Sequence, residues 1–199
     1  VKLSARALQW LGGINAVFAL GTAIYTGLLL GVVKAVPFWN TPMLPLLFLV
    51  SALSTGVGAV LLVLGLGRWL APAALQADAE HVVESEHLLS RVDIPLVVGE
   101  LLVLFFLLFI MGGSQSVAAE SARYLVAGGF AVAFWVGLVV VGLVAPVVLE
   151  AWALTRKGLS GGQVTSVGVV VGLCLLVGGI VLRYAVLSAG ANVSTTLGL

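Results

Sequence analysis

The sequence predicts an all-α fold, a polytopic transmembrane helix bundle with about five transmembrane helices and one cytoplasmic amphipathic segment. Hydrophobic residues make up 61% of the sequence and charged residues only 9%, with a mean hydropathy of +1.24. A soluble domain has roughly a quarter charged residues, so a water-exposed surface cannot be built from this composition. The 25 glycines are typical of helices that pack closely within a membrane.

Apolar runs set the positions of the predicted spans. A helix needs about 20 apolar residues to cross a hydrocarbon core of roughly 30 Å. Five runs are long enough, near residues 8–31, 43–66, 94–111, 124–149 and 164–187. The first run is too long for the core of a signal peptide and lacks a cleavage-like end, so we predict that it is a span. We expect one transmembrane domain over residues 1–199.

The cations give a predicted orientation. An odd number of spans puts the two termini on opposite sides. One side then holds Lys2, Arg6, Arg68, Arg91, Arg156 and Lys157, and the other holds Lys34, Arg123 and, near its end of the last span, Arg183. By the positive-inside rule the N-terminus is cytoplasmic and the C-terminus external. The longest connection, 71–90, mixes acidic and apolar residues and is predicted to form a helix on the cytoplasmic surface.

Several classes of function are excluded by composition. The net charge of +1 leaves no basic stripe for nucleic acid. The one cysteine, Cys174, cannot form an intramolecular disulfide, a thiolate zinc site or a cysteine-ligated iron–sulfur cluster, and is expected to be a small core residue. His81 and His87 lie outside the spans, so they cannot hold a haem between transmembrane helices, and no metal site is predicted.

Ionisable residues inside a span are costly and are therefore candidates for function. Asp93 and Glu100 are seven residues apart, which puts both carboxylates on one helix face. They could form a proton ladder, and Glu150, which closes the fourth span, or Arg183 could continue this proton path or complete an ion pair. An alternative interpretation for Arg91 and Glu150 is that they lie at the interface and extend into water.

The connection between the first two spans concentrates hydrogen-bond donors and aromatic rings. A quinone head group presents two carbonyl acceptors on a flat ring, so its site needs donors beside an apolar or aromatic wall. Tyr25, Lys34 and Asn40 provide donors, and Phe38 and Trp39 provide a wall. Trp39 is equally consistent with an interfacial aromatic belt that binds nothing.

The same stretch shows a family resemblance. Tyr25, the run Lys34-Ala35-Val36-Pro37-Phe38-Trp39-Asn40-Thr41-Pro42-Met43-Leu44-Pro45 and the run 48–56 resemble the polysulfide reductase NrfD-like family. Arg91, Asp93, Glu100 and Glu150 are similar to charged positions in later spans of such subunits. The resemblance extends over nearly all 199 residues.

This resemblance implies a membrane subunit of a respiratory oxidoreductase in a bacterial or archaeal cytoplasmic (inner) membrane. Such a subunit has no haem or iron–sulfur cluster of its own. It exchanges electrons between menaquinone or ubiquinone and an iron–sulfur (ferredoxin-like) partner, often with a molybdopterin catalytic subunit or a multihaem cytochrome. Tyr25 matches a tyrosine that hydrogen-bonds quinone, and Arg91, Glu100 and Glu150 match residues proposed for proton conduction.

This sequence departs from the family in its number of spans. Family members usually have about eight to ten spans, and this sequence resembles the C-terminal five, so we expect that upstream helices are missing or come from another polypeptide.

Two other functions stay open on the sequence alone. One is a small secondary transporter or ion channel that uses the buried carboxylates, and the other is a purely structural anchor.

Overall fold

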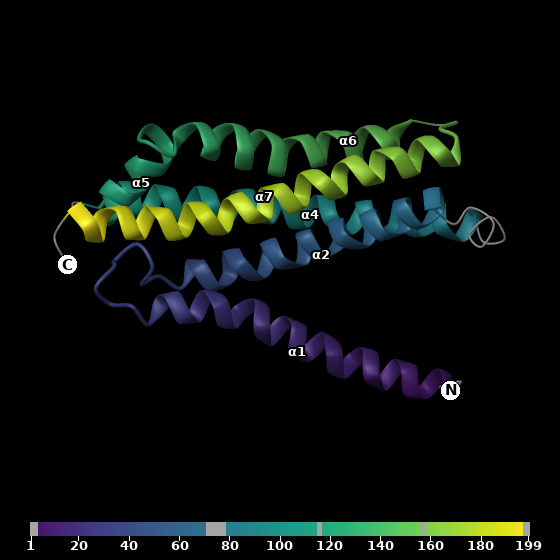
Figure 1. Ribbon diagram of the computed structural model, residues 1–199, viewed down its shortest axis with the longest axis horizontal. Helices are drawn as coiled ribbons and strands as arrows, with labels where there is room; N and C mark the ends of the chain where they lie inside the picture. Colours follow the sequence, from purple (N-terminus) through teal and green to yellow (C-terminus); the bar gives the residue numbers. More distant parts are fainter. Residues whose placement is uncertain (1–3, 71–78, 115–116, 157, 197–199) are drawn as a thin grey trace.

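The protein is a bundle of long helices running back and forth along one axis (Figure 1). The computed structural model describes residues 4–70, 79–114, 117–156 and 158–196. Over these residues the elements are α1 (Ala5–Gly31), α2 (Met43–Leu70), α4 (Ala79–Gly112), α5 (Val117–Ala127), η1 (Ala133–Val144), α6 (Ala145–Thr155) and α7 (Gly161–Thr196). Five helical stretches in this part of the protein are long and apolar enough to cross a membrane, and it contains no strand, which confirms the predicted fold class.

The fourth span begins later than the hydropathy predicts. We predicted 124–149, whereas the long apolar helix runs over Ala133–Thr155. Tyr124 belongs instead to α5, a short helix that ends at Ala127, and the backbone turns at Gly128 before the span starts. Hydropathy alone does not detect this turn because apolar residues continue through it.

The amphipathic stretch after 70 is helical but does not form a separate surface helix. From Ala79 it is the first part of α4, which continues without a break through Pro95 to Gly112. Residues 71–78 of this connection lie outside the described residues. Because the stretch belongs to a bundle helix, Val82 and Glu86 are buried between helices.

The fourth span changes helical type along its length. In η1 the backbone forms wide π-helical turns over 12 residues, and α6 continues the same span as an α-helix. At the junction the Ala145 N–H bonds to the Val140 carbonyl, five residues back. Pro146 has no N–H to continue an α-helical ladder and its ring crowds the carbonyl four residues earlier, so wide turns before it relieve both problems.

α7 is the central helix, and it packs against α2, α4, α5, η1 and α6. Two close crossings allow this. A Cβ on Gly172 would lie 2.5 Å from the Gly58 carbonyl oxygen of α2, and a Cβ on Gly178 would lie 2.5 Å from the Gly142 Cα of η1. Small residues therefore let the backbones approach, as is common in membrane bundles.

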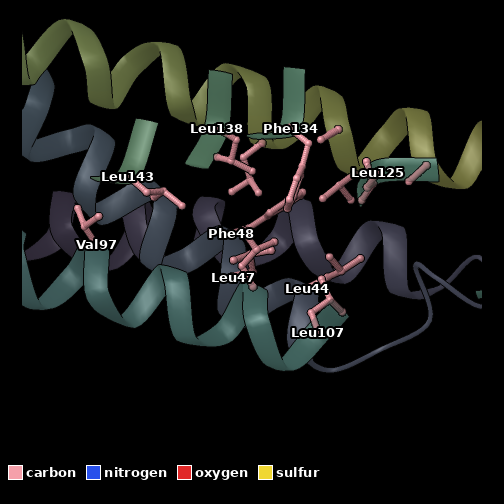
Figure 2. Packing of buried hydrophobic residues seen from close by; sticks show 14 of the residues in the cluster. Leu44, Leu47, Phe48, Val97, Leu107, Leu125, Phe134, Leu138 and Leu143 are labelled. Carbon is pink, nitrogen blue, oxygen red and sulfur yellow. The ribbon is translucent and has the colours of Figure 1, made fainter. Parts of the chain in front are cut away.

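The apolar core lies between α2, α4, α5, η1 and α7 (Figure 2). Its fully or nearly fully buried members include Leu44, Leu47, Phe48, Val97, Leu107, Leu125, Phe134, Leu138 and Leu143. This core fixes how α4 faces α2 and α7.

α1 lies at the edge of the bundle. Among the described elements it packs only against α2, where a Cβ on Gly27 would lie 2.5 Å from the Pro45 Cα. Toward its N-terminus it diverges from α2 (Figure 1), and residues 8–22 are exposed. The outer face of α1 is therefore open to lipid or to other protein.

We expect Gly178→Ala to destabilise the bundle, because the added methyl group would have to displace the η1 backbone at Gly142. Overpacking of this kind costs roughly 1–3 kcal/mol. Thermal unfolding of the purified protein in mild detergent would measure the loss. Gly56→Ala is the matched control, since a Cβ there has nothing within 4 Å; equal melting temperatures for the two variants would contradict the close crossing.

Candidate functional site

The bundle interior contains a line of carboxylates. Within the described residues Glu86, Asp93, Glu100 and Glu150 are all buried, with exposed fractions of 2%, 0%, 3% and 1%. The first three lie on α4 at intervals of seven residues, which is two helical turns and roughly 10 Å of rise per interval. The line on α4 is thus roughly 21 Å long, most of the thickness of a hydrocarbon core.

Glu86 begins the line and has polar partners from two other helices. Its Oε2 accepts from the Thr165 hydroxyl of α7 at 3.2 Å. The Arg68 guanidinium of α2 donates to the Thr165 oxygen at 2.8 Å and to the Gly161 carbonyl at 3.2 Å. Thr165 can also donate to the Gly161 carbonyl at 3.0 Å, so its single hydroxyl proton has two alternative acceptors.

Asp93 and Glu150 form the middle of the line. Glu150 comes from α6 and lies within electrostatic range of Asp93. The Ser54 hydroxyl of α2 lies beside Asp93, and Ser90 lies beside Glu150. Among the described residues, both oxygens of each carboxylate lack a partner that meets hydrogen-bonding geometry. Buried carboxyl groups without fixed partners can take part in a proton route where hydroxyl groups or water bridge them.

Glu100 lies farthest along the line. The Ser51 hydroxyl of α2 lies beside it, and Arg183 of α7 lies within electrostatic range. Arg183 donates to the Gly179 carbonyl at 2.9 Å, and its guanidinium lies 5.9 Å from the centre of the Phe48 ring. The cation is therefore held near Glu100 by its own helix and by an aromatic face.

Sequence reasoning identified three of these four carboxylates and missed Glu86. We assigned 71–90 to the surface because acidic residues are frequent there, and Glu84 is indeed exposed. The signal that identifies Glu86 is its position seven residues before Asp93, on the same helix face as Glu100. The serines that face the line, Ser51 and Ser54, were not singled out either.

Arg91 lies outside the line. It is exposed and lines an open cavity at the end of the bundle where α2 ends and α4 begins. His81 and His87 line the same cavity, and Cys174 is a half-buried free cysteine in α7.

The five residues predicted to bind quinone fall into two groups. Tyr25, Lys34 and Asn40 are exposed at the opposite end of the bundle, and no partner for their side chains is found among the described residues. Phe38 is completely buried in the core. The Trp39 indole N–H donates to the Val186 carbonyl of α7 at 2.8 Å, and its ring lies against Gly190. The donors are thus available to a ligand, whereas the two rings hold the α1–α2 connection on α7.

The protein has clear relatives. The family model described as polysulphide reductase, NrfD, matches residues 1–194. The sequence is 34% identical over 179 residues to protein NrfD of Escherichia coli strain K12, covering 87% of this protein and 50% of that one. It is 35% identical over 182 residues to the C chain of polysulfide reductase from Wolinella succinogenes, covering 89% and 52%.

A third relative, the protein NrfD homolog of Haemophilus influenzae, is 30% identical over 193 residues, covering 96% of this protein and 55% of that one. The sequence therefore spans about half the length of the curated relatives it matches. No solved structure matches it.

We expect Thr165→Val to destabilise the protein by roughly 1–3 kcal/mol, because it leaves the buried Glu86 and the Arg68 guanidinium without the hydroxyl between them. Thr165→Ser should restore most of this stability. Thermal unfolding in detergent measures both. The matched control is Ser166→Ala, which removes an exposed hydroxyl that bonds to the Gly162 carbonyl one residue away from Thr165. A loss of stability in this control as large as in Thr165→Val would contradict the role of Thr165 between Glu86 and Arg68.

Proposed function

This protein belongs to the polysulphide reductase NrfD family, and on that premise we propose that it is the membrane subunit of a respiratory oxidoreductase complex. In this function it binds menaquinone or ubiquinone and exchanges electrons between the quinone and a partner subunit. The proposal is supported most directly by the buried carboxylate line, because quinone reduction takes up one proton for each electron.

The carboxylate line provides a route for these protons. Glu86 lies toward the end of the bundle where α4 begins, and Glu100 lies toward the end that carries Tyr25. A carboxyl group accepts a proton on one oxygen and releases it from the other, but successive groups on α4 are roughly 10 Å apart along the helix, so transfer between them needs bridging hydroxyl groups or water. Serine and threonine hydroxyls beside the line extend it, since a hydroxyl both donates and accepts.

The quinone site is proposed to lie at the open face beside Tyr25. The Tyr25 side chain is 60% exposed, and Lys34 and Asn40 follow in the connection after α1. Their donors suit the two carbonyl oxygens of a quinone, and the exposed apolar residues of α1 suit its ring and tail. Because Phe38 and Trp39 are engaged in the core, the wall of the site is expected to come from α1 or from a helix of another polypeptide.

Electrons are proposed to reach the quinone from a partner. The sequence has one cysteine, too few for an iron–sulfur cluster of its own. One relative is named as a single component of polysulfide reductase, its C chain. By extension we propose an iron–sulfur (ferredoxin-like) partner for this protein, accompanied by a molybdopterin catalytic subunit or a multihaem cytochrome.

A secondary transporter or ion channel is the competing proposal, because a buried line of carboxylates also suits a coupling ion. The two proposals predict different behaviour in liposomes. A transporter moves an ion without quinone or partner subunits, whereas the redox subunit moves protons only during quinone turnover. Family membership favours the redox subunit.

Tyr25→Phe tests the quinone site in the complex purified from membranes with its partner subunits. Loss of the phenolic hydroxyl removes one hydrogen bond to the quinone and should raise the quinone KM about tenfold, as expected for one hydrogen bond. The steady-state kinetics of quinone reduction by the purified complex give this KM. Tyr184→Phe is the matched control, since Tyr184 is similarly exposed at 62% and lies on α7. Unchanged kinetics in Tyr25→Phe would remove this residue from the site, and a protein that purifies without a redox partner or bound quinone would refute the proposed function.

Glu100→Gln tests the proton route. The amide keeps the size of the side chain but cannot carry a proton, so quinone turnover should slow by at least about tenfold while quinone KM changes little. Glu86→Gln should have the same effect at the start of the line. Glu84→Gln, an exposed carboxylate on the same helix, is the control. Turnover at the rate of the unmodified complex in both buried variants would show that protons take another route.

A further inference from the structure

The end of the bundle where α4 begins contains a cavity lined in part by Arg68, whose guanidinium also bonds to Thr165 beside Glu86. It has a volume of about 940 Å³ and is lined by residues from the end of α2, the first turns of α4, the end of α6 and the start of α7. Its walls therefore come from segments far apart in the sequence.

The described residues that line the cavity carry more positive than negative charge. Arg68, Arg91 and Arg156 line it, and Glu84 is the one acidic side chain among the described residues of its lining. Glu84 already lies 4.0 Å from the His81 imidazole. Arg91 has no hydrogen bond or ion pair with any described residue, which leaves its guanidinium available to an external anion.

Two of the arginines are held in place. Arg68 is oriented by its hydrogen bonds to Thr165 and Gly161, and the Arg156 guanidinium lies 5.6 Å from the centre of the Trp152 ring. Fixed guanidinium groups lose little freedom when they bind, and their planar donors suit phosphate oxygens.

Two exposed tryptophans flank the cavity, as expected for a site at the depth of lipid head groups. Trp69 and Trp152 are both exposed, with fractions of 56% and 41%, and each is close to one of the cavity arginines. Exposed tryptophans at the ends of membrane helices mark the interface between hydrocarbon and water. The lining also includes apolar side chains, among them Leu88 and Leu154, so it combines a basic part with an apolar part.

We propose that this cavity binds an anionic phospholipid, with Arg68, Arg91 and Arg156 around the head-group phosphate and an acyl tail along Leu88. Basic pockets between membrane helices at this depth are suited to anionic head groups. A free phosphate would satisfy the arginines but not the apolar lining, so we assign the lipid. This inference does not depend on quinone chemistry and stands or falls separately from the proposed function.

Native mass spectrometry of the complex purified in mild detergent tests the proposal. The probes are phosphatidylglycerol and phosphatidylcholine with identical acyl tails, and inorganic phosphate. We expect phosphatidylglycerol to bind more tightly than phosphatidylcholine, and millimolar inorganic phosphate not to displace it. In Arg91→Gln/Arg156→Gln the affinity for phosphatidylglycerol should fall about thirtyfold, since each arginine near an anionic head group contributes about fivefold.

The matched control is Arg6→Gln/Arg123→Gln, which removes the same charge from exposed arginines that do not line the cavity. Arg91→Lys/Arg156→Lys should retain most of the binding and shows that the site tolerates substitution. Equal binding of the two lipids, or an equal loss in the control pair, would overturn the proposal. Displacement by inorganic phosphate would overturn the lipid assignment in favour of a free anion.

Discussion

Burying carboxylates inside a membrane bundle is the constraint on which the rest of this structure depends. Each such group costs several kcal/mol unless it is paired, hydrated or neutralised. α4 carries three of them on one face, so that face must lie toward polar groups and not toward lipid. α2 supplies Ser51, Ser54 and Arg68 to it, and α7 supplies Thr165 and Arg183. The positions of α2 and α7 beside α4 follow from this requirement together with the glycine crossings.

The fold class could be predicted because the bilayer leaves few alternatives. Backbone polar groups in hydrocarbon must bond within their own helix or within a closed barrel, and runs of about 20 apolar residues fit only the helix. The limits of the spans were harder to predict. Hydropathy does not distinguish the short helix α5 from the span that follows, because the turn at Gly128 interrupts the backbone and not the apolar composition. The π-helical turns of η1 have the same apolar composition as an ordinary span, so hydropathy gives no signal for them.

The carboxylates on α4 could be predicted from their seven-residue spacing along the helix. The spacing of Asp93 and Glu100 placed them on one face, and the same rule extends to Glu86 once α4 is known to begin at Ala79. The contacts between distant segments could not be predicted. Phe38 and Trp39 have the appearance of an interfacial or ligand-binding pair, but Trp39 reaches a carbonyl 147 residues away and packs where Gly190 leaves room. Neither partner is visible from the local sequence.

The π-helical stretch before α6 has a consequence for how the fourth span is aligned. A residue in a wide turn advances less far around the helix axis than a residue in an α-helix, so the 12 residues of η1 set the angle at which α6 leaves the middle of the membrane. At the observed angle Glu150 is buried and lies within electrostatic range of Asp93. Winding η1 back into an α-helix would rotate the downstream half of the span relative to α4 and move Glu150 away from this position. The local winding of one apolar segment therefore controls whether the fourth carboxyl group belongs to the line.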